Sequence, residues 1–107
     1  MTTFEERGKG FESKFKRDQE LQFKVMVRRN KLLGLWAAEK MGVVGADAET
    51  YSKDVVASDF DRPGDDDVLE KVHGDLVAKG LSLSAPDVRK EMERLVDFAR
   101  QQVESEN

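Results

Sequence analysis

The residues that could perform catalysis are few in this chain and poorly placed for it. There is one histidine, His73, and there is no cysteine. A lone histidine lacks the further nitrogen or sulfur ligands that a metal site needs, and a serine or threonine needs a neighbouring base to become a nucleophile. We therefore expect His73 to lie at a surface or boundary of the fold, and we expect the protein not to be an enzyme.

An acidic run, Asp65-Asp66-Asp67, follows two further aspartates, Asp59 and Asp61. Its spacing lacks the loop glycine and the terminal glutamate of a calcium-binding loop, so we expect no metal site. Acidic side chains favour the N-terminal end of a helix, which is the role we predict for the run. The nearest approach to a phosphate-binding loop, at Gly42 and Gly45, lacks the Lys-Ser/Thr pair that such a loop requires.

Cations and aromatic side chains near the middle of the chain could bind a nucleotide weakly. Trp36 or Tyr51 could stack on an adenine ring. Its phosphates could be held by Arg28, Arg29 or Lys31. One hypothesis is therefore a small helical sensor or regulator with ATP or ADP as a weak ligand, and without any tightly bound cofactor.

Three phenylalanines, Phe4, Phe11 and Phe15, lie among charged residues and glycines at the N-terminus. At about 100° per residue they fall within roughly 40° of one helix face. Gly8 and Gly10 lie between them, and each costs about 1 kcal/mol relative to alanine inside a helix. The segment has the pattern of a helix without the propensity to form one alone, which indicates an arm that folds on a partner. The alternative is that the phenylalanines pack on the chain's own core.

Charge divides the 107 residues into two parts. Residues 1–31 carry nine Lys/Arg and five Asp/Glu, whereas residues 32–107 carry nine and seventeen. A basic segment on an acidic body predicts binding to an acidic surface, and the acidic body argues against binding of nucleic acid.

No apolar run is long enough to cross a membrane, and no signal peptide is present. Because the chain also has no cysteine, we expect a cytoplasmic protein without direct membrane insertion.

The helical phase of the phenylalanines breaks near Asp18, because a new apolar stripe begins at Leu21. This break predicts a flexible N-terminal segment, residues 1–17, and a four-helix bundle, residues 18–107. The first helix of the bundle is expected to run from Asp18, as its N-cap, to Met41, with Gly42 as its stop. It is apolar on two faces, one with Leu21, Val25, Leu32, Leu35 and Trp36 and the other with Phe23, Met26, Leu33, Ala37 and Met41.

Three further helices follow. The second is expected from Asp47, as its N-cap, to about Phe60, and the third from the acidic run to about Gly80. The last has the strongest start signal: Ser84 as N-cap, Pro86 in the first turn and Asp87 completing a capping box. Its core stripe is Val88, Met92, Leu95, Val96, Ala99 and Val103. The predicted fold is all-α, a small four-helix bundle with a mobile N-terminal arm.

The run from Arg28 to Glu39, RRNKLLGLWAAE, closely resembles the signature of the ATP synthase inhibitor subunit zeta family of alphaproteobacteria. Phe11 to Phe15 and Asp18 to Lys24 resemble that family's N-terminal pattern, and the resemblance covers almost the whole chain. It implies a four-helix bundle whose N-terminal region enters the interface between the alpha and beta subunits of the synthase head, near the gamma shaft. The region becomes helical there and blocks rotation in the direction of ATP hydrolysis.

The resemblance assigns partner binding to the N-terminal arm. The implied partner-binding residues are Phe4, Arg7, Phe11, Lys14, Phe15 and Arg17. Gly8 and Gly10 stand where the family has helix-favouring residues, which predicts an affinity roughly tenfold lower per glycine. The chain is then expected to be monomeric when free, and to be held at the periphery of the inner membrane through the synthase.

Overall fold

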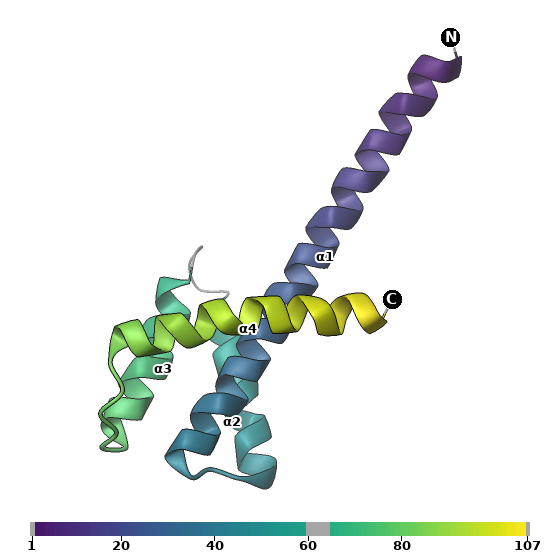
Figure 1. Ribbon diagram of the computed structural model, residues 1–107. Coiled ribbons are helices and arrows are strands. Elements are labelled where there is room, and N and C mark those ends of the chain that lie inside the picture. Colours follow the sequence, from purple (N-terminus) through teal and green to yellow (C-terminus); the bar gives the residue numbers. More distant parts are fainter. Residues whose placement is uncertain (1, 60–64, 107) are drawn as a thin grey trace.

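The computed structural model describes the backbone of residues 2–59 and 65–106, and the side chains of residues 17–59 and 65–106. These residues form four helices: α1, Thr2–Met41; α2, Gly45–Ser58; α3, Asp66–Ala78; and α4, Ala85–Glu106 (Figure 1). The described residues form no strand, so the predicted all-α class with four helices is confirmed.

The helix α1 is much longer than its three neighbours and gives the molecule its shape. Its 40 residues span about 60 Å at 1.5 Å per residue, and the molecule measures 65 × 25 × 21 Å. The C-terminal half of α1 packs on α2, α3 and α4, whereas its N-terminal half leads away from them (Figure 1). The molecule therefore consists of a compact body and one projecting stretch of helix.

The start of α1 differs from the sequence-based expectation. The helix begins at Thr2 rather than at Asp18, so Asp18 lies inside it and the predicted N-cap is wrong. The change of apolar phase at Leu21 does not interrupt the backbone hydrogen bonding of a helix, because side-chain phase and backbone continuity are independent. The predicted mobility of residues 1–17 concerns a segment whose side chains, apart from Arg17, lie outside the described residues.

Two glycines end helices as the sequence predicts. Gly42 has a φ of +75° after α1, and Gly80 has a φ of +81° after α3. In this left-handed conformation the chain turns back, so that the amide of Val43 donates to the carbonyl of Ala38 at 2.8 Å and the amide of Leu81 donates to that of Leu76 at 3.1 Å. Both are helix stops of the kind that favours glycine.

The two predicted caps of α2 and α4 have different outcomes. The N-cap of α2 is Val44 without a side-chain hydrogen bond, so the prediction of Asp47 is wrong, and Asp47 lies in the first turn. At α4 the capping box is confirmed: the amide of Ser84 donates to Oδ2 of Asp87 at 2.9 Å, and the amide of Asp87 donates to Oγ of Ser84 at 3.2 Å. The predicted end of α2 at Phe60 lies outside the described residues.

The main core lies where all four helices meet. Its buried members are Leu33, Ala37, Val55, Val68, Val72, Leu76, Val88, Met92 and Leu95. The predicted stripe of α4 is confirmed, with five of its residues buried and Val96 partly buried. Gly34 brings α1 and α2 close together, because a Cβ added there would lie 2.6 Å from the Cα of Ser52. This approach gives a structural reason for glycine within the RRNKLLGLWAAE run.

Candidate partner-binding site

The residues that the sequence assigns to partner binding lie on the projecting part of α1. Five of them, Phe4, Arg7, Phe11, Lys14 and Phe15, fall outside the residues whose side chains the structure describes. The sixth, Arg17, is exposed and lines a hollow of about 260 Å³ with Glu20, Leu21 and Lys24. The described site is therefore the base of the arm, from Arg17 to the point where α1 enters the body.

A small apolar cluster holds the base of the arm. Val25 of α1 packs with Ala99 and Val103 of α4, and all three are at most 3 % exposed. Leu21, Leu32 and Val96 pack around them. We call these residues the junction. Because α4 crosses α1 at this point (Figure 1), the junction fixes the direction in which the arm leaves the body.

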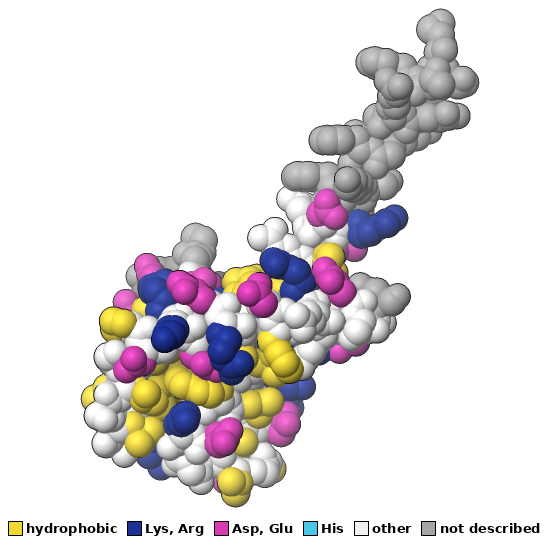
Figure 2. Space-filling model, in the orientation of Figure 1, with side chains coloured by type: hydrophobic (Ala, Val, Ile, Leu, Met, Phe, Trp, Pro, Cys, Tyr) yellow, Lys and Arg dark blue, Asp and Glu magenta, His cyan; other side chains and the backbone are white. Residues whose placement is uncertain are grey.

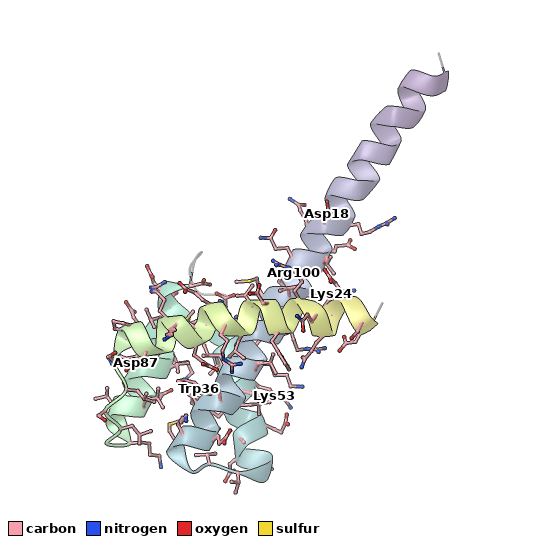
Figure 3. The ribbon with its side chains drawn as sticks, in the orientation of Figure 1. Asp18, Lys24, Trp36, Lys53, Asp87 and Arg100 are labelled. Atoms are coloured by element: carbon pink, nitrogen blue, oxygen red, sulfur yellow. The ribbon has the colours of Figure 1, made fainter. Side chains whose placement is uncertain are left out.

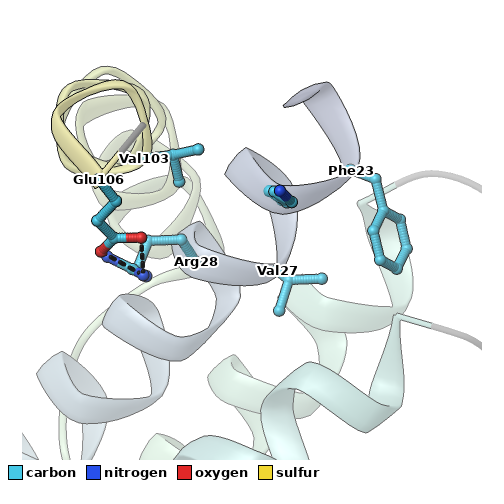
Figure 4. A pocket seen from close by; sticks show the side chains of 6 residues that line it. Phe23, Val27, Arg28, Val103 and Glu106 are labelled. Atoms are coloured by element: carbon cyan, nitrogen blue, oxygen red, sulfur yellow. Dashed lines mark hydrogen bonds and ion pairs between the residues drawn. The ribbon is translucent and has the colours of Figure 1, made fainter. Parts of the chain in front are cut away.

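Polar bonds from Arg28 close the outer edge of the junction. Its Nη1 donates to Oε1 of Gln102 at 3.0 Å, and its Nη2 lies 2.7 and 2.9 Å from the two carboxylate oxygens of Glu106 (Figure 4). Glu106 is more than half exposed, so this pair is solvent-screened and contributes little stability. Its effect is to orient the last turn of α4 on α1.

The neighbouring Arg29 has a different environment. It is 1 % exposed, and its Nη2 lies 2.8 Å from Oδ1 of Asp65 while its Nε donates to Oδ1 of Asn30 at 2.8 Å. Asn30 in turn donates to Oδ2 of Asp59 at 3.0 Å. These bonds tie α1 to the end of α2 and the start of α3. A buried guanidinium needs such partners, because an unpaired buried charge is strongly destabilising.

Tyr51 is enclosed by charged groups of α3. Its hydroxyl donates to Oδ2 of Asp75 at 2.9 Å, Lys71 lies 3.2 Å from the same oxygen, and the Lys71 ammonium is 5.4 Å from the centre of the ring. Burial and this hydrogen bond to Asp75 raise the pKa of Tyr51 above its ordinary value. The phenol therefore stays protonated and acts as a donor between α2 and α3.

The five residues of the nucleotide hypothesis face different neighbours. Arg28 and Lys31 line two adjoining hollows that share Val27, and Tyr51 lines a third. Trp36 packs on the main core, and Arg29 is buried against Asp65 (Trp36 is labelled in Figure 3). The fold does not bring their side chains into one site.

The acidic run is explained by pairing across helices. Asp66 and Asp67 lie in the first turn of α3, as predicted, and Asp65 and Asp66 pair with Arg29 and Arg89. Within residues 17–59 and 65–106 no group of His, Cys, Asp or Glu is arranged to hold a metal ion. His73 is half-buried on α3, at a boundary as expected.

Phe23, near this site, is more exposed than the sequence pattern predicts. It was assigned to one of the two apolar faces of α1, yet 58 % of it is exposed. It lies beside Lys24 and Val27 on the edge of a hollow of about 300 Å³ between α1 and the end of α4 (Figure 4).

Among the residues described, no helix is both long and apolar enough to cross a membrane.

The face of the body seen in Figure 2 mixes acidic and basic side chains with apolar patches.

A family model described as ATPase inhibitor subunit zeta matches residues 1–102. A protein whose solution NMR structure is known is 42 % identical, with a TM-score of 0.73 over 81 % of this chain and 99 % of that one. Among curated protein sequences none matches the chain. The family match spans the arm and the body together, and the chain belongs to the ATPase inhibitor subunit zeta family.

Proposed function

We propose that this chain blocks ATP hydrolysis by the catalytic head of an F-type ATP synthase through residues 1–17. The family is named for ATPase inhibition, which is a regulatory role and not a catalytic one. In this proposal the arm enters an interface between alpha and beta subunits near gamma. Phe4, Phe11 and Phe15 are the apolar anchors there, and Arg7, Lys14 and Arg17 meet acidic groups.

The observation that carries the proposal is the family match, which begins at residue 1 and so includes the arm. The course of α1 supports it, because about 24 Å of helix from residue 2 to residue 17 lies beyond the junction. A helix that leaves a compact body by this length can reach into a narrow interface while the body stays outside. The junction and the Arg28 bonds give this helix a defined direction.

The proposal places the protein in the cytoplasm, at the inner membrane only through the synthase, and as a monomer when free. The two described core clusters are built by residues from Leu21 to Val103, so deletion of residues 2–17 should leave the body folded. The test is to delete residues 2–17 and to assay ATP hydrolysis by the purified head. The full chain should inhibit and the shortened chain should not; equal inhibition by both would contradict the proposal.

The nucleotide hypothesis remains a separate candidate, and one observation favours a location for it. Tyr51 lines a hollow with Lys71 and Lys79, where an aromatic ring lies beside two cations. Asp75 borders the same hollow and would oppose an anion. Titration with ATP, followed through backbone amide shifts, should give saturable changes confined to this hollow if a nucleotide binds there; shifts that do not saturate would exclude it.

A further inference from the structure

One face of α1 is open between α2 and α4. Within the described residues, α2 and α4 each pack on α1 but not on each other, while α3 contacts all three of the other helices. Two hollows lie along this open face, one of about 300 Å³ beside the end of α4 and one of about 220 Å³ beside α2, and Val27 lines both. Together they form a groove with α1 as its floor.

The groove combines apolar side chains with a net positive charge. Four basic residues line it against two acidic ones, Glu49 and Glu106, and Glu106 is paired with Arg28. Phe23, Val27 and Val56 supply its apolar surface, and Phe23 is 58 % exposed. Lys24, Lys31 and Lys53 are exposed along it, and among the described residues none of the three forms an ion pair (Lys24 and Lys53 are labelled in Figure 3). Aromatic side chains are enriched in the buried part of protein interfaces, and charged side chains around them govern the choice of partner.

We propose that this groove is a second docking surface, and that it binds an acidic segment with an apolar face on the same partner that the arm engages. The charge of the lysines selects an acidic occupant. The chain's own arm is a poor occupant, because residues 1–17 carry five Lys/Arg and three Asp/Glu and so share the sign of the groove. The choice of partner rests on the proposed function: Phe23 follows Arg17 by about 9 Å along one helix, so a surface that holds the arm lies beside the groove.

The structure offers a matched control for the phenylalanine. Phe98 of α4 is 49 % exposed and lines none of the hollows of the groove. Phe23→Ala in the full chain should weaken binding to the purified synthase head roughly tenfold, whereas Phe98→Ala should leave it unchanged. Maximal inhibition of hydrolysis at saturation should be the same for both variants and for the wild type, because the arm is intact. Equal affinity of Phe23→Ala and Phe98→Ala would overturn the proposal.

Charge reversal tests the acidic character of the partner. Lys24→Glu, Lys31→Glu and Lys53→Glu together should weaken binding more than tenfold at low salt and flatten its salt dependence. Reversal of three exposed basic residues outside the groove, Lys40, Lys90 and Arg100, gives the same change in net charge and should have a much smaller effect. Similar losses from both triple variants would contradict a specific groove.

Two outcomes distinguish this proposal from the proposed function and from self-association of the chain. If the wild-type chain binds the head but does not inhibit it, the proposed function fails while the affinities of the groove variants still decide the role of the groove. If Phe23→Ala abolishes self-association of the chain and leaves affinity for the head unchanged, the occupant is a second copy and the proposal is wrong. Circular dichroism and the unfolding temperature of each variant establish that the body is folded.

Discussion

The two apolar clusters of the body hold α1 in different ways. The main core has nine buried residues drawn from all four helices, whereas the junction has three, drawn from α1 and α4 alone. The C-terminal half of α1 is therefore fixed from several sides, and the base of the arm is fixed from one. Folding of the body and the direction of the arm therefore depend on different sets of buried residues.

Two consecutive arginines repeat the contrast. Arg29 is buried and joins α1 to Asp65 beside the main core, whereas Arg28 is 28 % exposed and joins α1 to the end of α4. Removing the partner of a buried charge is strongly destabilising, whereas an exposed pair contributes about 0–1 kcal/mol. The RRNKLLGLWAAE run thus contains one arginine that holds the body together and one that lies at the junction.

The largest effect should come from the main core. Leu33→Ala removes a fully buried side chain, and truncations of this kind cost about 2–5 kcal/mol. A small helical body should then unfold at a much lower denaturant concentration, measurable by circular dichroism. If the midpoint were nearly unchanged, the main core would not be the principal source of stability and the contrast between the clusters would fail.

A smaller and more local effect should come from the junction. Val103→Ala removes two methyl groups at the edge of the fold, which costs about 1–2 kcal/mol. Amide shifts should change along residues 17–32 and 96–106 and stay constant in α3. Shift changes throughout α2 and α3 would show that the two clusters are one cooperative unit.

Substitution of the two glycines of the arm should strengthen its helix. Gly8→Ala and Gly10→Ala should each favour the helix by about 1 kcal/mol, which corresponds to roughly five- to tenfold tighter inhibition of the head. The unfolding midpoint of the body should not change. A dose–response curve of hydrolysis against chain concentration makes the measurement, and an unchanged or weaker inhibition would mean that the arm does not bind as a continuous helix.

The smallest effect is pH-dependent and belongs to the start of α4. The amide and hydroxyl of Ser84 hold the pKa of Asp87 below its usual range. Because this pKa is lower in the folded state, the ionised carboxylate stabilises the fold at pH values above the ordinary pKa of aspartate, near 4. This stabilisation is lost as the pH falls through the pKa of Asp87 in the folded state. Asp87→Asn should therefore lower the unfolding temperature slightly at pH 7, with a difference that disappears at acidic pH. A difference independent of pH would exclude the carboxylate as the cap.

Local signals in the sequence predict α4 and the helix stops well. The capping box and the six-residue apolar stripe of α4 are short-range features of the sequence. The stripe lies on one face of the helix, and that face packs on the core. The glycines at 42 and 80 act through backbone conformation alone, so their role does not depend on distant parts of the chain.

The environment of α1 could not be predicted in the same way. The burial of Arg29 depends on Asp65, which is 36 residues away, and the exposure of Phe23 depends on the gap between α2 and α4. The two apolar faces of α1 were visible in the sequence, but only the packing of the other helices decides which residues they cover. Of the six predicted partner-binding residues, only Arg17 has a described side chain, and partner binding by all six stays a prediction.

The central claim is that inhibition resides in the phenylalanines of the arm. The most direct measurement is ATP hydrolysis by the purified head at saturating concentrations of the full chain carrying Phe4→Ala, Phe11→Ala and Phe15→Ala, with Phe98→Ala as the control. The arm variant should lose inhibition while its unfolding midpoint stays that of the wild type, and the control should inhibit fully. Full inhibition by the arm variant would contradict the account.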